Sequence, residues 1–169
     1  AVYEMAAHAI DLVNYLIGKP FKIIGSTLSK IFSSNVEDAV TSTLLYPNGV
    51  SGTIDINWSD TSYRKPTNKF EVFGKRGRLL ADQHSLKIFM NEPNKDYSLS
   101  KGWNTQYITD LFEPVPFYVR GNEFTRQLYH FIDCIKGNAV NNSCSFEDGA
   151  NVLDVIESIY ADYDKNGNC

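Results

Sequence analysis

The 169-residue chain has the composition of one globular domain, with 43% hydrophobic, 13% aromatic and 21% charged residues. Its 16 Lys and Arg against 20 Asp and Glu give a net charge of −4, so it lacks the basic surface that a nucleic acid or an anionic membrane requires. No apolar run approaches the roughly 20 residues of a membrane span, and no signal peptide opens the chain. We therefore expect a cytoplasmic protein with neither nucleic acid nor membrane as a partner.

The cysteines point to the same compartment. Cys134, Cys144 and Cys169 make an odd count, and they form neither a C-x-x-C pair nor a zinc-type spacing. The sequence therefore predicts three reduced thiols, no disulfide framework and no metal site built from cysteines.

The first segment is predicted to be an amphipathic helix. Its apolar stripe, at three- and four-residue spacing, consists of Met5, Ala9, Leu12, Val13 and Leu16. Gly18-Lys19-Pro20 ends it, because glycine can take the left-handed position after a helix and proline cannot continue one. No capping residue precedes the helix at Ala1, so we expect the chain to be part of a longer protein.

The middle of the chain predicts an antiparallel sheet. Residues 39–46 and 50–58 flank Pro47-Asn48-Gly49, in which Asn-Gly supplies the positive φ of a hairpin turn. Further predicted strands cover 21–32, 69–74, 78–82 and 86–90. Strands joined by short turns, rather than by helices, form antiparallel sheets.

Residues 91–116 are predicted to be a long irregular connection, and two helices follow it. The first carries an apolar stripe from Phe124 to Ile135. The second begins at Ser145, which forms a capping box with Asp148, and extends to about Tyr163. The predicted buried face of this last helix comprises Phe146, Ala150, Leu153, Ile156 and Tyr160.

Glu4, His8, Asp11 and Tyr15 form a second stripe on the first helix, at spacings of four, three and four. At about 100° per residue it lies roughly 110° from the apolar stripe. This is the only place in the sequence where local geometry brings a histidine and two carboxylates together. A carboxylate one turn away can orient an imidazole and change its pKa, so Glu4 and His8 are a candidate acid–base pair.

Spacing alone leaves other interpretations open. The stripe could be the solvent-facing side of a surface helix, or Glu4, His8 and Asp11 could ligate a divalent metal, although the sequence offers no further ligand. Trp58, at the end of a predicted strand, could stack on a sugar ring or belong to the core. The sequence contains no Gly-rich phosphate loop, no P-loop and no G-x-S-x-G motif.

Five motifs, taken in order, resemble the C-terminal domain of the glucose–fructose oxidoreductase and myo-inositol dehydrogenase (Gfo/Idh/MocA) family, across essentially the whole chain. They are Glu4-x-x-x-His8-x-x-Asp11 with Gly18-Lys19-Pro20, Glu37-Asp38 before Asn48-Gly49, residues 70–77, residues 116–124, and Ser145-Phe146-Glu147-Asp148-Gly149-Ala150. The ordered set is far more specific than any single motif. The resemblance implies an α+β fold: an open, mainly antiparallel sheet with helices on one face, similar to the C-terminal domain of dihydrodipicolinate reductase.

The resemblance also implies a function. Residues 1–169 would be the substrate-binding and catalytic domain of a two-domain NAD- or NADP-dependent oxidoreductase. Its N-terminal Rossmann domain would carry the cofactor-binding loop and a Glu-Lys-Pro motif with a catalytic lysine, neither of which occurs here. The family's histidine corresponds to His8, its following aspartate to Asp11 and its first acid to Glu4, where the family more often has aspartate.

We therefore expect the substrate-binding half of a sugar, sugar-nucleotide or cyclitol dehydrogenase that oxidises a secondary alcohol. His8 and Glu4 would be catalytic, Asp11 and Trp58 would bind substrate, and no residue of this chain would bind the cofactor or a metal. The partners would be a sugar or polyol, the Rossmann domain and further copies of the chain, joined through the open sheet face. The alternative is a non-catalytic ligand-binding or oligomerisation module with the same fold.

Overall fold

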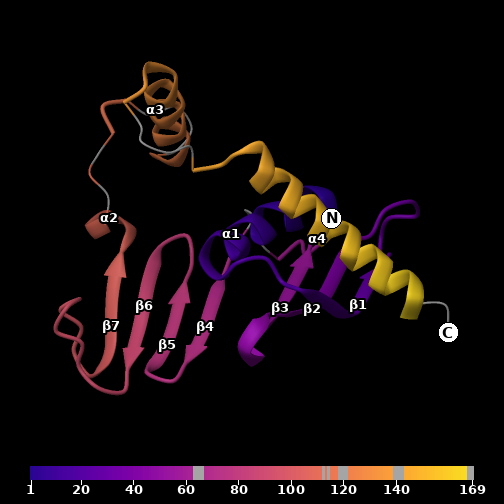
Figure 1. The fold of residues 1–169 in the computed structure, drawn as a ribbon, viewed down its shortest axis with the longest axis horizontal. Coiled ribbons are helices and arrows are strands. Elements are labelled where there is room, and N and C mark those ends of the chain that lie inside the picture. Colours follow the sequence, from indigo (N-terminus) through magenta and orange to yellow (C-terminus); the bar gives the residue numbers. More distant parts are fainter. Residues whose placement is uncertain (63–66, 112, 114, 118–121, 139–142, 167–169) are drawn as a thin grey trace. The chain divides into compact units, whose positions relative to one another are not determined.

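The computed structural model describes residues 1–169 except 63–66, 112, 114, 118–121, 139–142 and 167–169 (Figure 1). The chain divides into two compact units, one of residues 1–62 with 142–169 and one of residues 63–141. The predicted site residues Glu4, His8, Asp11 and Trp58 all belong to the first unit.

The first unit contains a three-stranded antiparallel sheet in the order β1-β2-β3. Its strands are β1 (Lys22–Ser29), β2 (Ala39–Leu45) and β3 (Ser51–Asn57). Asn48 and Gly49 in the turn between β2 and β3 have φ values of 65° and 76°, which confirms the predicted hairpin. Val40 pairs with Ile56 across the hairpin, and this face of the sheet is buried.

A β-bulge in β1 turns one backbone amide toward the last helix. The pairing of β1 with β2 shifts between Ile24 and Thr27, and Gly25 within this interval has a φ of 65°. A bulge of this kind needs a residue that tolerates the left-handed conformation. The Ser26 amide donates a 2.7 Å hydrogen bond to Asp162 Oδ2, and the Ser42 hydroxyl donates to the Ser26 hydroxyl inside the core.

Two long helical segments cover the buried face of this sheet. A π-helical turn, η1 (Val2–Ala6), continues into α1 (Ala7–Ile17), and α4 (Phe146–Asn166) packs against β1 and α1. The shared hydrophobic core consists of Val2, Ala6, Ile10, Ile23, Val40, Leu44, Tyr46, Ile54, Val152, Val155, Ile156 and Ile159.

The predicted buried stripe of the first helix is wrong at Leu12 and Leu16, which remain 44% and 50% exposed. Ala9 and Val13 of the same stripe do pack against the core. The residues that the helix buries most fully are Val2, Ala6 and Ile10. At about 100° per residue, Leu12 lies roughly 200° from Ile10, so the two side chains cannot share the face that meets the sheet.

The predicted capping box of α4 is present. Asp148 Oδ2 accepts from the Ser145 amide at 2.7 Å, and the Ser145 hydroxyl accepts from the Asp148 amide at 3.2 Å. The predicted buried face is only partly correct: Ile156 is buried and Tyr160 is half-buried, but Phe146, Ala150 and Leu153 are exposed. Burial in this helix begins at Val152, so its first turns make little contact with the core.

The second unit is built on a four-stranded antiparallel sheet in the order β4-β5-β6-β7. Its strands are β4 (Phe70–Gly74), β5 (Gly77–Ala81), β6 (Ser85–Met90) and β7 (Gly102–Tyr107). The strand β7 and the short helix α2 (Ile108–Leu111) correct the prediction that 91–116 is irregular. The sequence of β7 does contain a strand pattern, because polar residues alternate with Trp103, Thr105 and Tyr107. The prediction of an irregular segment gave more weight to the prolines of this region.

The remaining helix of the second unit is α3 (Asn122–Lys136). Thr125 is its buried residue, whereas the predicted apolar stripe from Phe124 to Ile135 is 41–70% exposed. Helices and wholly antiparallel sheets thus make up the described chain, and in the first unit the helices lie on one face of the sheet (Figure 1). The predicted α+β class is confirmed.

Candidate active site on the first helix

The predicted site residues lie on the outer side of the first helix. Glu4 belongs to η1, and His8 and Asp11 belong to α1. Glu4 and His8 are exposed and Asp11 is half-buried, whereas Val2 and the other core residues of the helix face the sheet. At about 100° per residue, the stripe is roughly opposite the buried face. The structure thus places the three side chains on one accessible face.

These side chains have no structural partner within the described residues. Glu4, His8 and Asp11 form no side-chain hydrogen bond or ion pair with another described residue. Among the same residues, no group of three or more His, Cys, Asp or Glu is close enough to hold a metal ion. An accessible imidazole with carboxylates one turn away on either side can exchange a proton with a ligand and accept hydrogen bonds from its hydroxyls.

Trp58 follows directly after β3, the strand that contacts η1. Its side chain is 54% exposed, so it is not a core residue. Its amide donates a 2.8 Å hydrogen bond to the Asp38 carbonyl, which fixes the backbone at this point. The exposed indole offers an apolar face on which a sugar ring could stack.

Asp38, the second residue of the Glu37-Asp38 motif, is a buried carboxylate for which the sequence predicted no role. Its Oδ2 accepts hydrogen bonds from the amides of Ile31, Phe32 and Ser33, at 2.7–2.9 Å. Hydrogen bonds from the Ser33 and Phe32 amides and the Ser59 hydroxyl hold the pKa of Asp38 well below its usual 3.8. Asp38 therefore fixes the loop after β1 and the end of β3, next to Trp58.

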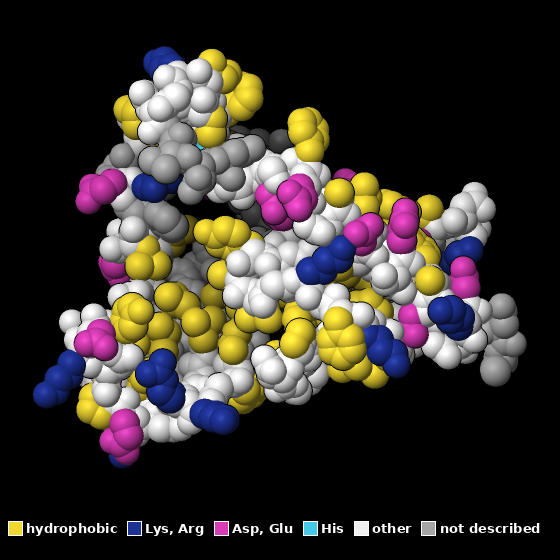
Figure 2. All heavy atoms as spheres, viewed as in Figure 1, with side chains coloured by type: hydrophobic (Ala, Val, Ile, Leu, Met, Phe, Trp, Pro, Cys, Tyr) yellow, Lys and Arg dark blue, Asp and Glu magenta, His cyan; other side chains and the backbone are white. Residues whose placement is uncertain are grey.

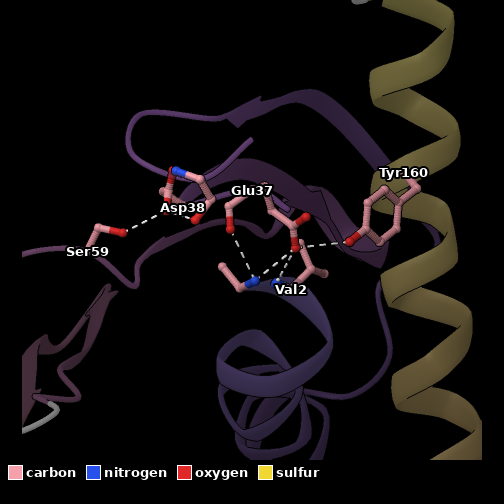
Figure 3. A network of polar contacts seen from close by, with 7 residues as sticks. Val2, Glu37, Asp38, Ser59 and Tyr160 are labelled. Carbon is pink, nitrogen blue, oxygen red and sulfur yellow. Dashed lines mark hydrogen bonds and ion pairs between the residues drawn. The ribbon is translucent and has the colours of Figure 1, made fainter. Parts of the chain in front are cut away.

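Glu37 connects the start of the first helix to α4, as Figure 3 shows. Its Oε1 accepts from the Ala1 nitrogen at 2.9 Å, from the Val2 amide at 2.8 Å and from the Tyr160 hydroxyl at 3.0 Å. Burial raises the pKa of Glu37, but the hydrogen bonds outweigh burial and lower this pKa from 4.5 to about 2. The carboxylate is thus charged at neutral pH. Only the Glu37-Asp38 pair before a strand marked these residues in the sequence.

The structure also has a hollow of about 570 Å³ in the second unit, over one face of β4–β6. Its lining includes Val72, Leu79, Ile88 and Tyr97, together with Lys75 and Arg76. None of the predicted site residues lines it, so the candidate site is the helix face and not this hollow.

Comparison with known protein families supports the same region. Residues 1–80, which include η1, α1 and the whole first sheet, match the model described as the GFO/IDH/MocA C-terminal domain. This segment of the chain thus resembles a GFO/IDH/MocA C-terminal domain. The four candidate residues Glu4, His8, Asp11 and Trp58 all lie within the matched segment.

Solved structures share the fold of the chain over nearly its whole length. Levoglucosan dehydrogenase in complex with NADH and levoglucosan aligns with a TM-score of 0.76 and 22% identity, covering 96% of this chain and 47% of that one. The WlbA dehydrogenase of Bordetella pertussis, in complex with NADH and UDP-GlcNAcA, aligns with a TM-score of 0.67 and 15% identity, covering 98% and 43%.

A third structure, the aldose-aldose oxidoreductase of Caulobacter crescentus complexed with glycerol, aligns with a TM-score of 0.63 and 21% identity, covering 95% of this chain and 44% of that one. The chain therefore spans about half the length of these oxidoreductases. A comparison with curated protein sequences finds no significant match. Among the described residues, no helix combines the length and the apolar character needed to cross a membrane.

Proposed function

We propose that this chain is the substrate-binding and catalytic half of an NAD- or NADP-dependent dehydrogenase. The enzyme would oxidise a secondary alcohol of a sugar, sugar nucleotide or cyclitol in the cytoplasm. The observation that carries the proposal is the accessible Glu4–His8–Asp11 face, on a helix within the segment that matches the family. The shared fold with sugar dehydrogenases supports the substrate class.

Oxidation of a secondary alcohol removes a hydride, which the nicotinamide accepts, and a proton, which a protein group must take. His8 takes this proton from the substrate hydroxyl, or relays it to the lysine expected in the Rossmann domain. Glu4, one turn before His8, orients the imidazole once substrate is bound, because catalytic hydrogen bonds commonly form only in the substrate complex. Asp11 accepts hydrogen bonds from the substrate's other hydroxyls, and Trp58 stacks on the ring.

The described residues of this chain do not fit a dinucleotide. Such a site needs close-approaching glycines between a strand and the N-terminus of a helix. The described glycines with positive φ lie instead after helices (Gly18, Gly137), in the bulge (Gly25), in the hairpin (Gly49) and at the first residues of β5 and β7 (Gly77, Gly102). We therefore assign the cofactor to a separate Rossmann domain, and titration of this chain alone with NAD or NADP should give no saturable heat.

Replacing His8 by Ala in the full-length protein tests the proposal. If His8 takes or relays the proton, His8→Ala lowers kcat by about 10²- to 10⁴-fold, the usual contribution of an acid–base group. The KM of the cofactor should stay constant, because another domain binds it. Glu4→Gln should cause a smaller loss, because the amide still offers an acceptor but lacks the charge.

The matched control is His84→Ala, which removes an exposed histidine from the turn before β6. It should leave kcat unchanged. Thermal unfolding of each variant corrects the turnover for the folded fraction. A His8→Ala enzyme with normal turnover per folded molecule would overturn the catalytic assignment and favour the non-catalytic ligand-binding or oligomerisation module.

A further inference from the structure

Glu37 caps the Val2 amide of the catalytic helix from outside the helix. Its Oε1 accepts a 2.8 Å hydrogen bond from this amide. The Glu37 side chain is only 12% exposed, so an unsatisfied carboxylate or amide at this place would be costly.

Tyr160 holds this cap from the opposite side. Its hydroxyl donates a 3.0 Å hydrogen bond to Glu37 Oε1 (Figure 3). Its ring stacks on Tyr3, with ring centroids 5.7 Å apart and an interplanar angle of 26°. Tyr3 directly precedes Glu4, so α4 contacts both the capping carboxylate and the turn that it caps.

The far end of the helix is held less firmly. Lys19 Nζ, just beyond α1, lies 2.6 Å from Asp154 Oδ2 and 3.1 Å from Asn151 Oδ1 of α4. The side chains of this ion pair are 40% and 62% exposed, and exposed ion pairs contribute little to stability. Among the described polar contacts of this helix, the half-buried Glu37–Tyr160 pair is therefore the stronger constraint on its direction.

We infer that Glu37 and Tyr160 are positioning residues, which fix the first helical turn and through it the place of Glu4 and His8. The inference rests on the proposed function, because it assigns the pair a role in the reaction of His8. His8 lies about 9 Å along the helix axis from Val2, at 1.5 Å per residue. A change of direction at Val2 therefore displaces the imidazole, and a misplacement of about 1 Å can cost a factor of about 10² in rate.

The experiment uses the full-length protein with Glu37→Ala, Glu37→Gln and Tyr160→Phe. Glu37→Ala should lower kcat per folded molecule by about 10-fold or more, with the cofactor KM constant. Glu37→Gln keeps an acceptor oxygen for the Val2 amide and should recover most of this loss. Tyr160→Phe keeps the ring on Tyr3 and should cause a smaller loss than Glu37→Ala.

Asp162→Ala is the matched control. Asp162 also joins α4 to the sheet, through the Ser26 amide, but its bond does not involve the first helix. This variant should lower the thermal midpoint and leave kcat per folded molecule unchanged. Hydrogen exchange of the amides of residues 2–8 should accelerate in Glu37→Ala and not in Asp162→Ala.

A double-variant cycle separates positioning from simple destabilisation. Because groups that act through one another are non-additive, adding Glu37→Ala to His8→Ala should cause no further loss of kcat. If Glu37→Ala instead reduces kcat by the same factor in both backgrounds, the positioning role is wrong and the proposed function stands. If His8→Ala alone has normal turnover, the proposed function fails, and the positioning role fails with it.

Discussion

The Ser59 hydroxyl donates a 2.7 Å hydrogen bond to Oδ1 of Asp38, joining the residue after Trp58 to the segment that enters β2. The other carboxylate oxygen of Asp38 accepts three amides of the loop after β1, from Ile31, Phe32 and Ser33. Asp38 is fully buried. One ionised side chain therefore holds two segments that have no regular secondary structure of their own.

This arrangement predicts an acid-dependent loss of stability. Because the pKa of Asp38 lies below its usual 3.8 in the folded protein, the carboxylate stabilises the fold above about pH 4, and this contribution is lost as the pH falls further. The Asp38→Asn variant has a side chain of nearly the same shape, but this side chain does not titrate. Urea unfolding should show the wild type to be more stable than Asp38→Asn at pH 7, and the difference should shrink by pH 2.5.

Glu37, whose pKa falls from 4.5 to about 2 on folding, titrates over the same range in both proteins. The difference between wild type and Asp38→Asn therefore isolates Asp38. An equal difference at pH 7 and pH 2.5 would show that the ionisation of Asp38 does not contribute to stability.

The sequence predicted those features that depend on neighbouring residues. The Asn48-Gly49 hairpin and the Ser145–Asp148 capping box are both present, because their geometry involves only residues a few positions apart. The long-range polar contacts were not predictable in this way. Glu37 contacts Val2, which is 35 positions away in the sequence, and Tyr160, which is 123 positions away. No local sequence pattern specifies such contacts.

The candidate site shows the same division. The stripe of Glu4, His8 and Asp11 was predicted from helical spacing, and the structure places it on an exposed helix face. The spacing did not predict the π turn at Val2–Ala6. It also did not predict that Glu37 and Tyr160 contact this turn and each other, because these residues are far apart in the sequence.

Gly77 is predicted to be indispensable to the β4–β5 hairpin. A Cβ atom at this position would lie only 1.8 Å from the Phe89 carbonyl oxygen of the neighbouring strand, which is backbone and cannot rotate away. Gly77→Ala should therefore destabilise the protein by about 3 kcal/mol, the upper end of overpacking costs. Denaturant unfolding measures this change.

Gly74→Ala is the control, because it sits directly opposite Gly77 in the same hairpin. A Cβ atom there would be 3.8 Å from the nearest backbone oxygen, an ordinary contact. This variant should change the free energy of unfolding by less than about 1 kcal/mol. Equal effects of the two variants would contradict the close approach of Phe89.

The capping box of α4 is predicted to contribute measurably to stability. Ser145→Ala removes the hydroxyl that accepts from the Asp148 amide and should cost about 1 kcal/mol. Ser158→Ala, within the same helix, removes a hydroxyl that bonds to the Asp154 carbonyl, a contact that does not stabilise helices. Thermal unfolding should show a lower midpoint for Ser145→Ala alone, and equal midpoints for the two variants would contradict the cap.

Aromatic side chains form a row across the second sheet. The strand register places Phe73 opposite Arg78, Arg78 opposite Phe89, and Phe89 opposite Trp103, and residues directly opposite share one face of a sheet. The Arg78 guanidinium lies 4.7 Å from the centre of the Phe73 ring, and Phe89 meets Trp103 edge-on at 5.3 Å. Phe73 is 76% exposed and Trp103 is 53% exposed.

This row is our candidate for the expected association surface. Tyr46 is buried in the core of the first unit, so its ring is not accessible to another copy of the chain, whereas Phe73 is exposed. Figure 2 shows hydrophobic side chains gathered over the β4–β7 sheet, with charged side chains around them. Exposed apolar patches of this kind commonly meet a partner.

We expect the chain to self-associate through this aromatic row. Light scattering at about 50 µM should give a mass of at least two chains, a concentration at which an interface of ordinary size is largely formed. Phe73→Ser combined with Trp103→Ser should shift the protein toward the monomer, because it removes the exposed rings and leaves the strand register intact. Tyr97→Ser removes a 75% exposed ring outside the row and should leave the mass unchanged. A wild-type monomer at this concentration, or equal dissociation by Tyr97→Ser, would show that the row is not the association surface.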